Sequence, residues 1–170
     1  MSLPYQPADY AAALEGQSGR GLRIGLLLDM GIGLSVDPAV RAACEAAAKA
    51  LEDDGAVVES MPSFLTEEMF DSVLRFFEAR SYLEIDAMPE ATRAKVLPFI
   101  VQWCSHRARN FSGSDVMAAY NGVMAMRAAA VRATGAFDFV ISPTSPILPY
   151  AADLPSPTDD PGNALAHIAF

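Results

Sequence analysis

Residues 22–61 carry the sequence LRIGLLLDMGIGLSVDPAVRAACEAAAKALEDDGAVVESM, in which two aliphatic runs flank an amphipathic segment. The first run, Leu22–Asp29, is nearly continuous in aliphatic residues, which is typical of a parallel strand covered on both faces. Asp37 and Pro38 predict a helix start, because the aspartate caps free N–H groups and proline suits the first helical position. Gly55 suits the end of this helix, and Ala56–Met61 predicts a second strand. Strand, helix and strand in this order indicate a right-handed βαβ unit.

The chain changes character after Pro62 and becomes helical in pattern. Thr66–Ile85 is amphipathic, and the apolar side chains that we expect toward a core are Met69, Val73, Phe76, Phe77 and Leu83. Val96–Trp103 predicts a second helix, and a third opens at Ser112 or Ser114 and ends at Gly135. Phe137–Ser142 predicts a third strand. We therefore expect an α/β fold, with a βαβ unit, a helical middle segment and a further strand in a mixed, mostly parallel sheet covered by helices.

This pattern predicts one domain over residues 1–170. Its parts are a lead-in (1–21) with a short helix at Pro7–Leu14, the βαβ unit (22–61), a helical cap-like segment (64–134), a strand with a pocket turn (137–150) and a proline-rich tail (151–170). Asp9 can cap the short helix. Asn163–Phe170 begins an apolar stretch that stops with the chain, so we expect a truncated tail.

Composition excludes several classes of protein. Hydrophobic residues make up 52% and charged residues 19%, which argues against disorder, and the net charge of −9 would repel nucleic acid. No run reaches the roughly 20 apolar residues of a membrane span, and no secretory leader is recognisable. The mean hydropathy of +0.21 leaves open either a mostly internal sheet or an apolar face meant for another part of the protein. The unclustered Cys44 and Cys104 favour reduced thiols and a cytoplasmic location.

No catalytic constellation is complete in this sequence. His106 follows Cys104 by two positions, which points the two side chains apart on a helix, and His167 has no evident partner. Lys49 and Lys95 lie in helical segments, away from any Gly/Ser-rich turn. No cluster has metal-ligand spacing, so we expect no metal. We also expect no cofactor, and no catalytic residue in this chain.

A dinucleotide site at Gly31-Ile32-Gly33 is the alternative that these residues leave open. The glycines follow a strand and precede a helix, and Glu59 lies near the end of the next strand, where an acid could meet a ribose. However, Val36 occupies the third glycine position, and Asp37 would place a carboxylate where the pyrophosphate should bind.

The order of motifs resembles the amidase signature family. The segments that carry the resemblance are Asp9-Tyr10, Leu22–Gly25, Val36–Arg41, Ala46–Ala48 with Leu51, Gly55–Glu59, Tyr120 with Arg127, and Phe137–Pro146. They cover nearly the whole chain, and the ordered set is more specific than any single piece.

The resemblance implies hydrolysis of an amide C–N bond, without metal, by a serine assisted by a second serine and a lysine. In the family those residues lie in a Gly/Ser-rich region upstream of the segments matched here, and Ser112-Gly113-Ser114 is better explained as a helix cap. We therefore expect a part of an amidase that is inactive alone and binds the remainder of the enzyme and a small-molecule amide.

The expected substrate contacts are Thr144 first and Ser145 second, with Pro143 in the same turn, because ligands bind beyond the carboxyl ends of parallel strands. A rigid turn that only redirects the chain is the alternative. Two other classes of protein stay open: a non-catalytic small-molecule or nucleotide-binding module, and a scaffold that forms a homodimer through its apolar face.

Overall fold

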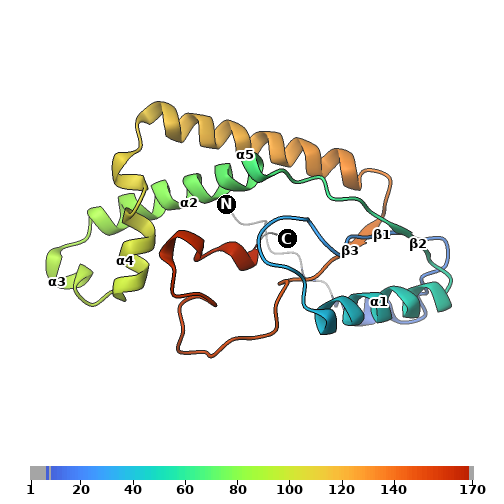
Figure 1. Ribbon diagram of the computed structural model, residues 1–170. Coiled ribbons are helices and arrows are strands. Elements are labelled where there is room, and N and C mark those ends of the chain that lie inside the picture. Colours follow the sequence, from blue (N-terminus) through green and yellow to red (C-terminus); the bar gives the residue numbers. More distant parts are fainter. Residues whose placement is uncertain (1–6, 8, 169–170) are drawn as a thin grey trace.

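The computed structural model describes Pro7 and residues 9–168, and a three-stranded parallel sheet lies at one end of it (Figure 1). Strand β1 (Arg23–Leu26) lies between β2 (Val57–Ser60) and β3 (Phe139–Ile141). The βαβ unit, the helical middle segment and the third strand are all present in the predicted order. The predicted α/β fold class is therefore confirmed, and the sheet, expected to be mixed and mostly parallel, is parallel throughout its three strands.

Glycine in the central strand permits close packing on one face of the sheet. A Cβ atom at Gly25 would lie 2.6 Å from Sδ of Met61 and 3.1 Å from the ring of Phe137. Met61 also belongs to a buried cluster with Leu27 and Met30, against which the side chains of Ile32, Phe64, Leu65, Ala133 and Phe137 pack. This cluster joins the sheet to the helical segment.

The strands of the sheet differ in how far they are covered. Ile24 and Gly25 of β1 are buried, as expected of a strand covered on both faces. In β3, however, Phe139 is 62% exposed and Val140 is exposed as well. Because successive side chains of a strand point to opposite faces, both faces of β3 are open. Cover on both faces, which was expected of the first aliphatic run, therefore holds for the central strand, and β3 lacks it.

Helix α1 (Pro38–Asp53) begins and ends where the sequence predicts. The Asp37 carboxylate accepts a hydrogen bond of 2.7 Å from the Ala39 amide, and Pro38 occupies the first helical position. Gly55 follows the helix with φ of 99°, a left-handed conformation that favours glycine. The chain turns there directly into β2, and α1 packs against that strand.

Two long helices form the middle of the molecule. Helices α2 (Glu67–Asp86) and α5 (Gly113–Thr134) lie side by side and antiparallel (Figure 1). Thr66 caps α2 through the Met69 amide, and Ser112 forms a reciprocal capping box with Asp115 at the start of α5. The short helices α3 (Glu90–Arg93) and α4 (Pro98–Ser105) connect them at the end remote from the sheet (Figure 1).

Burial along α2 departs from the predicted apolar face. Phe77 is exposed and Leu83 is 70% exposed, whereas Phe70, Ala79 and Ile85 are buried. The prediction that Phe77 and Leu83 face a core is therefore wrong within this chain. The helical periodicity was sufficient to predict the helix, but the face that is covered depends on where α5 lies.

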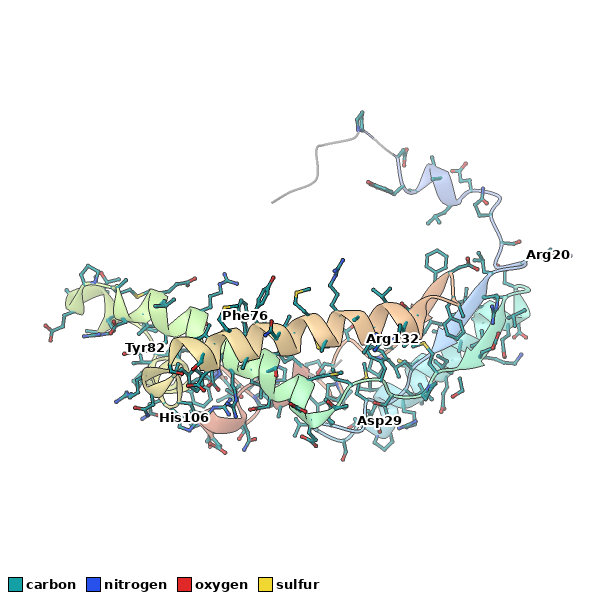
Figure 2. All side chains as sticks on the ribbon, turned by 90° about the horizontal axis from the view of Figure 1, so that it is seen from above. Arg20, Asp29, Phe76, Tyr82, His106 and Arg132 are labelled. Atoms are coloured by element: carbon teal, nitrogen blue, oxygen red, sulfur yellow. The ribbon has the colours of Figure 1, made fainter. Side chains whose placement is uncertain are left out.

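The two ends of the described chain contain only short turns. The lead-in holds a 3-10 turn (Ala12–Leu14), and Asp9 accepts hydrogen bonds from the Ala11 and Ala12 amides, as its capping role predicts. Residues 9–18 are all exposed, and this arm extends away from the body (Figure 2). The tail forms the 3-10 turns Pro161–Asn163 and Ala166–Ile168, and the rest of the predicted apolar stretch, residues 169–170, lies outside the described residues.

Candidate functional site

Three loops meet at the carboxyl edge of the sheet, where parallel folds bind ligands. They follow β1, β2 and β3, and backbone hydrogen bonds tie the first residue of two of these loops to the end of a neighbouring strand: Leu27 N donates to Ile141 O (2.9 Å) and Met61 N to Leu26 O (2.8 Å). Further out, Asp37 N donates to Pro146 O at 2.7 Å. The turn after β3 is thereby held against the start of α1.

The predicted substrate contacts lie in this turn. Pro143 is buried, Thr144 is exposed and Ser145 is half-buried. The Ser145 hydroxyl accepts a hydrogen bond of 3.5 Å from the Ile147 amide within the turn. The geometry thus brings the three residues to the sheet edge that topology predicts, with the Thr144 side chain accessible. Their part in substrate binding stays a prediction.

The glycine loop after β1 does not have the arrangement of a pyrophosphate site. Gly31 and Gly33 adopt φ of 72° and 70°, and the Asp29 carboxylate accepts a hydrogen bond from the Gly31 amide (2.8 Å). Asp37 covers the N-terminus of α1 with a negative charge, which would repel a phosphate. Glu59, the candidate ribose ligand, forms an ion pair of 2.9 Å with Arg23. These contacts disfavour the dinucleotide alternative.

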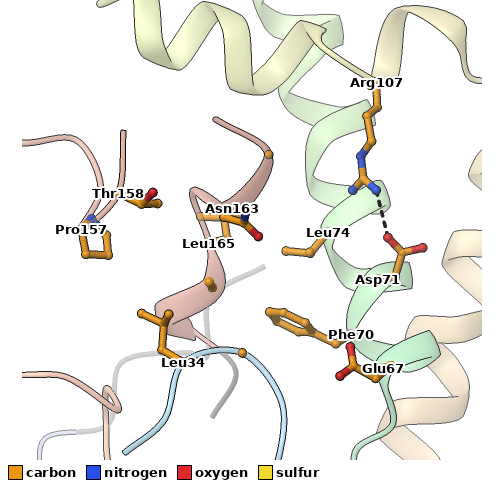
Figure 3. A pocket seen from close by; sticks show the side chains of 13 residues that line it. Leu34, Glu67, Phe70, Asp71, Leu74, Arg107, Pro157, Thr158, Asn163 and Leu165 are labelled. Atoms are coloured by element: carbon orange, nitrogen blue, oxygen red, sulfur yellow. Dashed lines mark hydrogen bonds and ion pairs between the residues drawn. The ribbon is translucent and has the colours of Figure 1, made fainter. Parts of the chain in front are cut away.

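A cavity of about 680 Å³ lies between α2 and the tail (Figure 3). The apolar side chains that line it are Leu34, Phe70, Leu74, Pro157, Leu165 and Ala166. The polar side chains that line it are Glu67, Asp71, Arg107, Thr158 and Asn163. Leu34 N donates to Ala166 O at 3.3 Å, which joins the glycine loop to the tail beside the cavity. The residues of the β3 turn, 143–145, do not line it.

Arg107 joins two acidic residues of α2 at one end of this cavity. Its Nε donates to Glu78 Oε2 (2.9 Å), its Nη2 to Glu78 Oε1 (2.9 Å) and its Nη1 to Asp71 Oδ1 (3.0 Å). Glu78 is only 2% exposed, so this forked pair compensates a buried carboxylate. Asp71 also accepts a hydrogen bond from Arg75 at 2.6 Å.

These contacts alter the protonation equilibria of the cluster. Desolvation acts to raise the pKa of Asp71, but hydrogen bonds from Arg107 and Arg75 and their positive charges hold this pKa below its usual range. The hydrogen bond to Glu78 is the largest effect on Arg107, and it raises the pKa of the guanidinium despite partial burial. Both effects favour the charged forms of Asp71 and Arg107 near neutral pH.

The apolar periodicity of α2 did not predict this cluster, although the sequence contains one signal for it. Asp71 and Glu78 are seven residues apart, which places them on one face of a helix, and Leu74 lies between them on the same face. A carboxylate on an apolar face requires a partner. Nothing in the sequence indicates that this partner is Arg107, because two further helices, α3 and α4, separate α2 from Arg107 in the chain.

The other candidate residues are not brought together. Cys104 is buried, whereas His106 is exposed. Burial is the main cause that raises the pKa of the Cys104 thiol. Lys49 pairs with Asp53, and neither it nor Lys95 bonds to a serine within residues 9–168. The described residues contain no group of three His, Cys, Asp or Glu side chains that could hold a metal ion. In the same part of the chain no helix is long and apolar enough to cross a membrane.

Comparisons with known proteins agree with the motif order. The family model for amidases matches residues 1–170. The crystal structure of a bacterial aryl acylamidase of the amidase signature family resembles this chain with a TM-score of 0.74 and 21% sequence identity. The similarity covers 95% of this chain and 36% of that enzyme, so the chain spans about a third of its length. No curated protein matches the sequence. The chain belongs to the amidase family.

Proposed function

We propose that this chain is a part of an amidase that hydrolyses a carboxylic amide, and that it supplies a portion of the sheet and of the substrate pocket. By this proposal the Ser–Ser–Lys residues that attack the amide come from another portion of the enzyme, and the chain alone is inactive. Membership in the amidase family supports the reaction class. The open faces of β3 support the need for a further portion.

The carrying observation is the uncovered apolar sheet. Val57 of β2 and Phe139 and Val140 of β3 are all exposed, although a parallel sheet is ordinarily buried on both faces. The solved aryl acylamidase is also much longer than this chain. An additional portion that covers β3 would remove this apolar surface from water and bring a nucleophile to the carboxyl edge of the sheet.

We further propose that Thr144 contacts the amide, with Ser145 and Pro143 shaping the same turn. Thr144 is exposed at the carboxyl edge, and the bond from Asp37 N to Pro146 O holds the turn in place. A hydroxyl at this position can donate to the amide oxygen or accept from its N–H group. Residues 64–134 would then form the specificity cap and residues 22–61 and 137–150 the sheet portion, in a protein located in the cytoplasm.

The test is an assay with a chromogenic aryl amide, 4-nitroacetanilide, chosen because the similar solved structure is an aryl acylamidase. We expect no turnover by the 170-residue chain. Turnover is expected when a Ser–Ser–Lys signature portion is supplied, either in one polypeptide or as a separate chain. In that active form Thr144→Ala should raise KM several-fold, because one polar contact to the amide is lost.

Ser18→Ala is the matched control, since Ser18 also loses an exposed hydroxyl and lies in the lead-in, outside both the turn and residues 64–134. It should leave KM unchanged. Turnover by the chain alone that survives Thr144→Ala and Ser145→Ala would show that catalytic residues lie within this chain. An unchanged KM in the active Thr144→Ala form would leave the turn a purely structural element.

A further inference from the structure

The cavity between α2 and the tail has a composition that restricts what it can bind. Its volume of about 680 Å³ is within the range of small-molecule sites, roughly 300–1,000 Å³. Phe70 and Leu74 form an apolar wall on α2, and Leu165 faces them from the tail (Figure 3). A ligand here can therefore place an apolar body, such as an aromatic ring, against this wall and still leave room for a polar group.

The charges around the cavity sum to a negative value. Glu67 has no ion-pair partner among residues 9–168, and its carboxylate lines the cavity beside Phe70 (Figure 3). Arg107 is balanced by Glu78 and Asp71. Arg75 is the second partner of Asp71 and adds one positive charge. The carboxylates of Glu67, Asp71 and Glu78 still exceed the guanidinium groups of Arg75 and Arg107 by one negative charge.

The N-terminus of α2 does not reverse this sign. A helix N-terminus carries about half a positive charge. Glu67 and Glu68 occupy the first turn of α2 and outweigh it, and Thr66 already accepts the Met69 amide. An anion in the cavity would therefore meet a negative potential.

Hydrogen-bond acceptors also face the cavity from the tail. Asn163 lines it and donates its Nδ2 to Asp160 Oδ2 at 2.6 Å, which leaves its side-chain oxygen as an acceptor. The Thr158 hydroxyl accepts from the Asp160 amide at 3.1 Å. Acceptors on both walls, together with the net negative charge, match an ammonium group with several N–H donors.

We propose that this cavity is a binding site for a compact organic cation, an ammonium group attached to an aromatic or branched aliphatic body. The apolar body lies against Phe70, Leu74 and Leu165. The ammonium group lies at Glu67 on the α2 wall, and the acceptors of the tail line the opposite wall (Figure 3). The site does not involve Thr144 and is independent of the hydrolytic proposal.

The experiment measures binding of three probes of similar size to the purified chain at neutral pH and low salt. The probes are 2-phenylethylammonium, neutral 3-phenylpropanamide and anionic 3-phenylpropanoate. We expect the cation to bind about tenfold more tightly than the anion, with the neutral amide between them, because the sign of the interaction with Glu67 reverses. Titration by nuclear magnetic resonance reports the dissociation constant and whether Phe70 and Leu74 shift.

Glu67→Gln should reduce the preference for the cation to about threefold or less, since one carboxylate is removed. Glu68→Gln is the matched control, because Glu68 lies one residue further on α2 and does not line the cavity. Leu74→Trp should weaken the binding of all three probes, because the larger side chain fills the cavity. Asn163→Ala is a second cavity variant in case Leu74→Trp fails to fold, because Asn163 is an exposed residue outside α2.

Three results would overturn the proposal: no saturable binding of the cation, equal or tighter binding of the anion, or an equal effect of Glu67→Gln and Glu68→Gln. None of them depends on amide turnover. Failure of the cation site and failure of the amidase assignment are therefore distinguishable.

Discussion

Replacement of Arg107 by methionine tests the buried charge cluster. Methionine preserves much of the side-chain length but removes the guanidinium, so the carboxylate of Glu78 stays buried without its forked partner. Loss of one partner of a buried pair typically costs about 3–5 kcal/mol. The Arg107 side chain is 31% exposed, so water can reach the cluster, and we expect a loss of about 3 kcal/mol.

Equilibrium unfolding in urea, followed by circular dichroism, measures this loss as a lower midpoint at an unchanged slope. The control is the double variant Arg107→Met with Glu78→Leu, which removes both charges. Because apolar replacements of a buried pair are often neutral, we expect the double variant to recover to within about 1 kcal/mol of the original protein. The reasoning is refuted if Arg107→Met costs less than about 1 kcal/mol, or if the double variant is no more stable than Arg107→Met.

The same cluster predicts a pH dependence. The pKa of Asp71 is lowered in the folded protein, so its ion pairs stabilise the fold fully above the ordinary aspartate pKa of about 4. This stabilisation is lost as the pH falls from there through the lowered pKa. Unfolding titrations at decreasing pH should show a shallower decline in Arg107→Met than in the original protein, because one of the two guanidinium partners of Asp71 is gone. An identical decline would show that Arg107 does not contribute to the lowered pKa.

Two further predictions concern packing and thiol reactivity. A Cβ atom at Gly122 of α5 would overlap the side chain of Ser72 on α2. Gly122→Ala should therefore lower the free energy of unfolding, measured in urea, by about 1–3 kcal/mol. Gly113→Ala is the control, because a Cβ atom there meets open space, and it should not destabilise the fold. Adding Ser72→Gly should rescue Gly122→Ala, and additive losses would contradict the contact. Cys104 is buried and its thiol pKa is raised, so iodoacetamide should alkylate it far more slowly than the half-buried Cys44. Peptide mapping measures the two rates, and equal rates would contradict the burial of Cys104.

Local signals predicted the elements of this fold with few errors. Asp37-Pro38 and Gly55 delimit α1 because capping and left-handed turns depend on adjacent residues alone. The strands are shorter than the aliphatic runs, since only Arg23–Leu26 of the first run pairs within the sheet. The helix α3 was not predicted, as its four residues carry too little periodicity.

The candidate sites were predictable to different degrees. The turn at Thr144 follows a strand of a parallel sheet, so topology places it at the carboxyl edge, where such folds ordinarily bind ligands. The cavity beside Asp71 depends instead on contacts between α2, Arg107 and the tail, which are far apart in the chain. Periodicity contains no information on such contacts, because they arise only when the helices have packed.

By itself the sequence determined the α/β class, the order of the elements, the amidase resemblance and the cap at Asp37, because each depends on neighbouring residues or on the order of motifs. Only the tertiary structure decided that Arg107 forms a bidentate pair with Glu78 and that Phe139 and Leu83 stay exposed. Burial and ion pairing depend on which surfaces meet in space, and a periodic pattern specifies an apolar face without specifying what covers it.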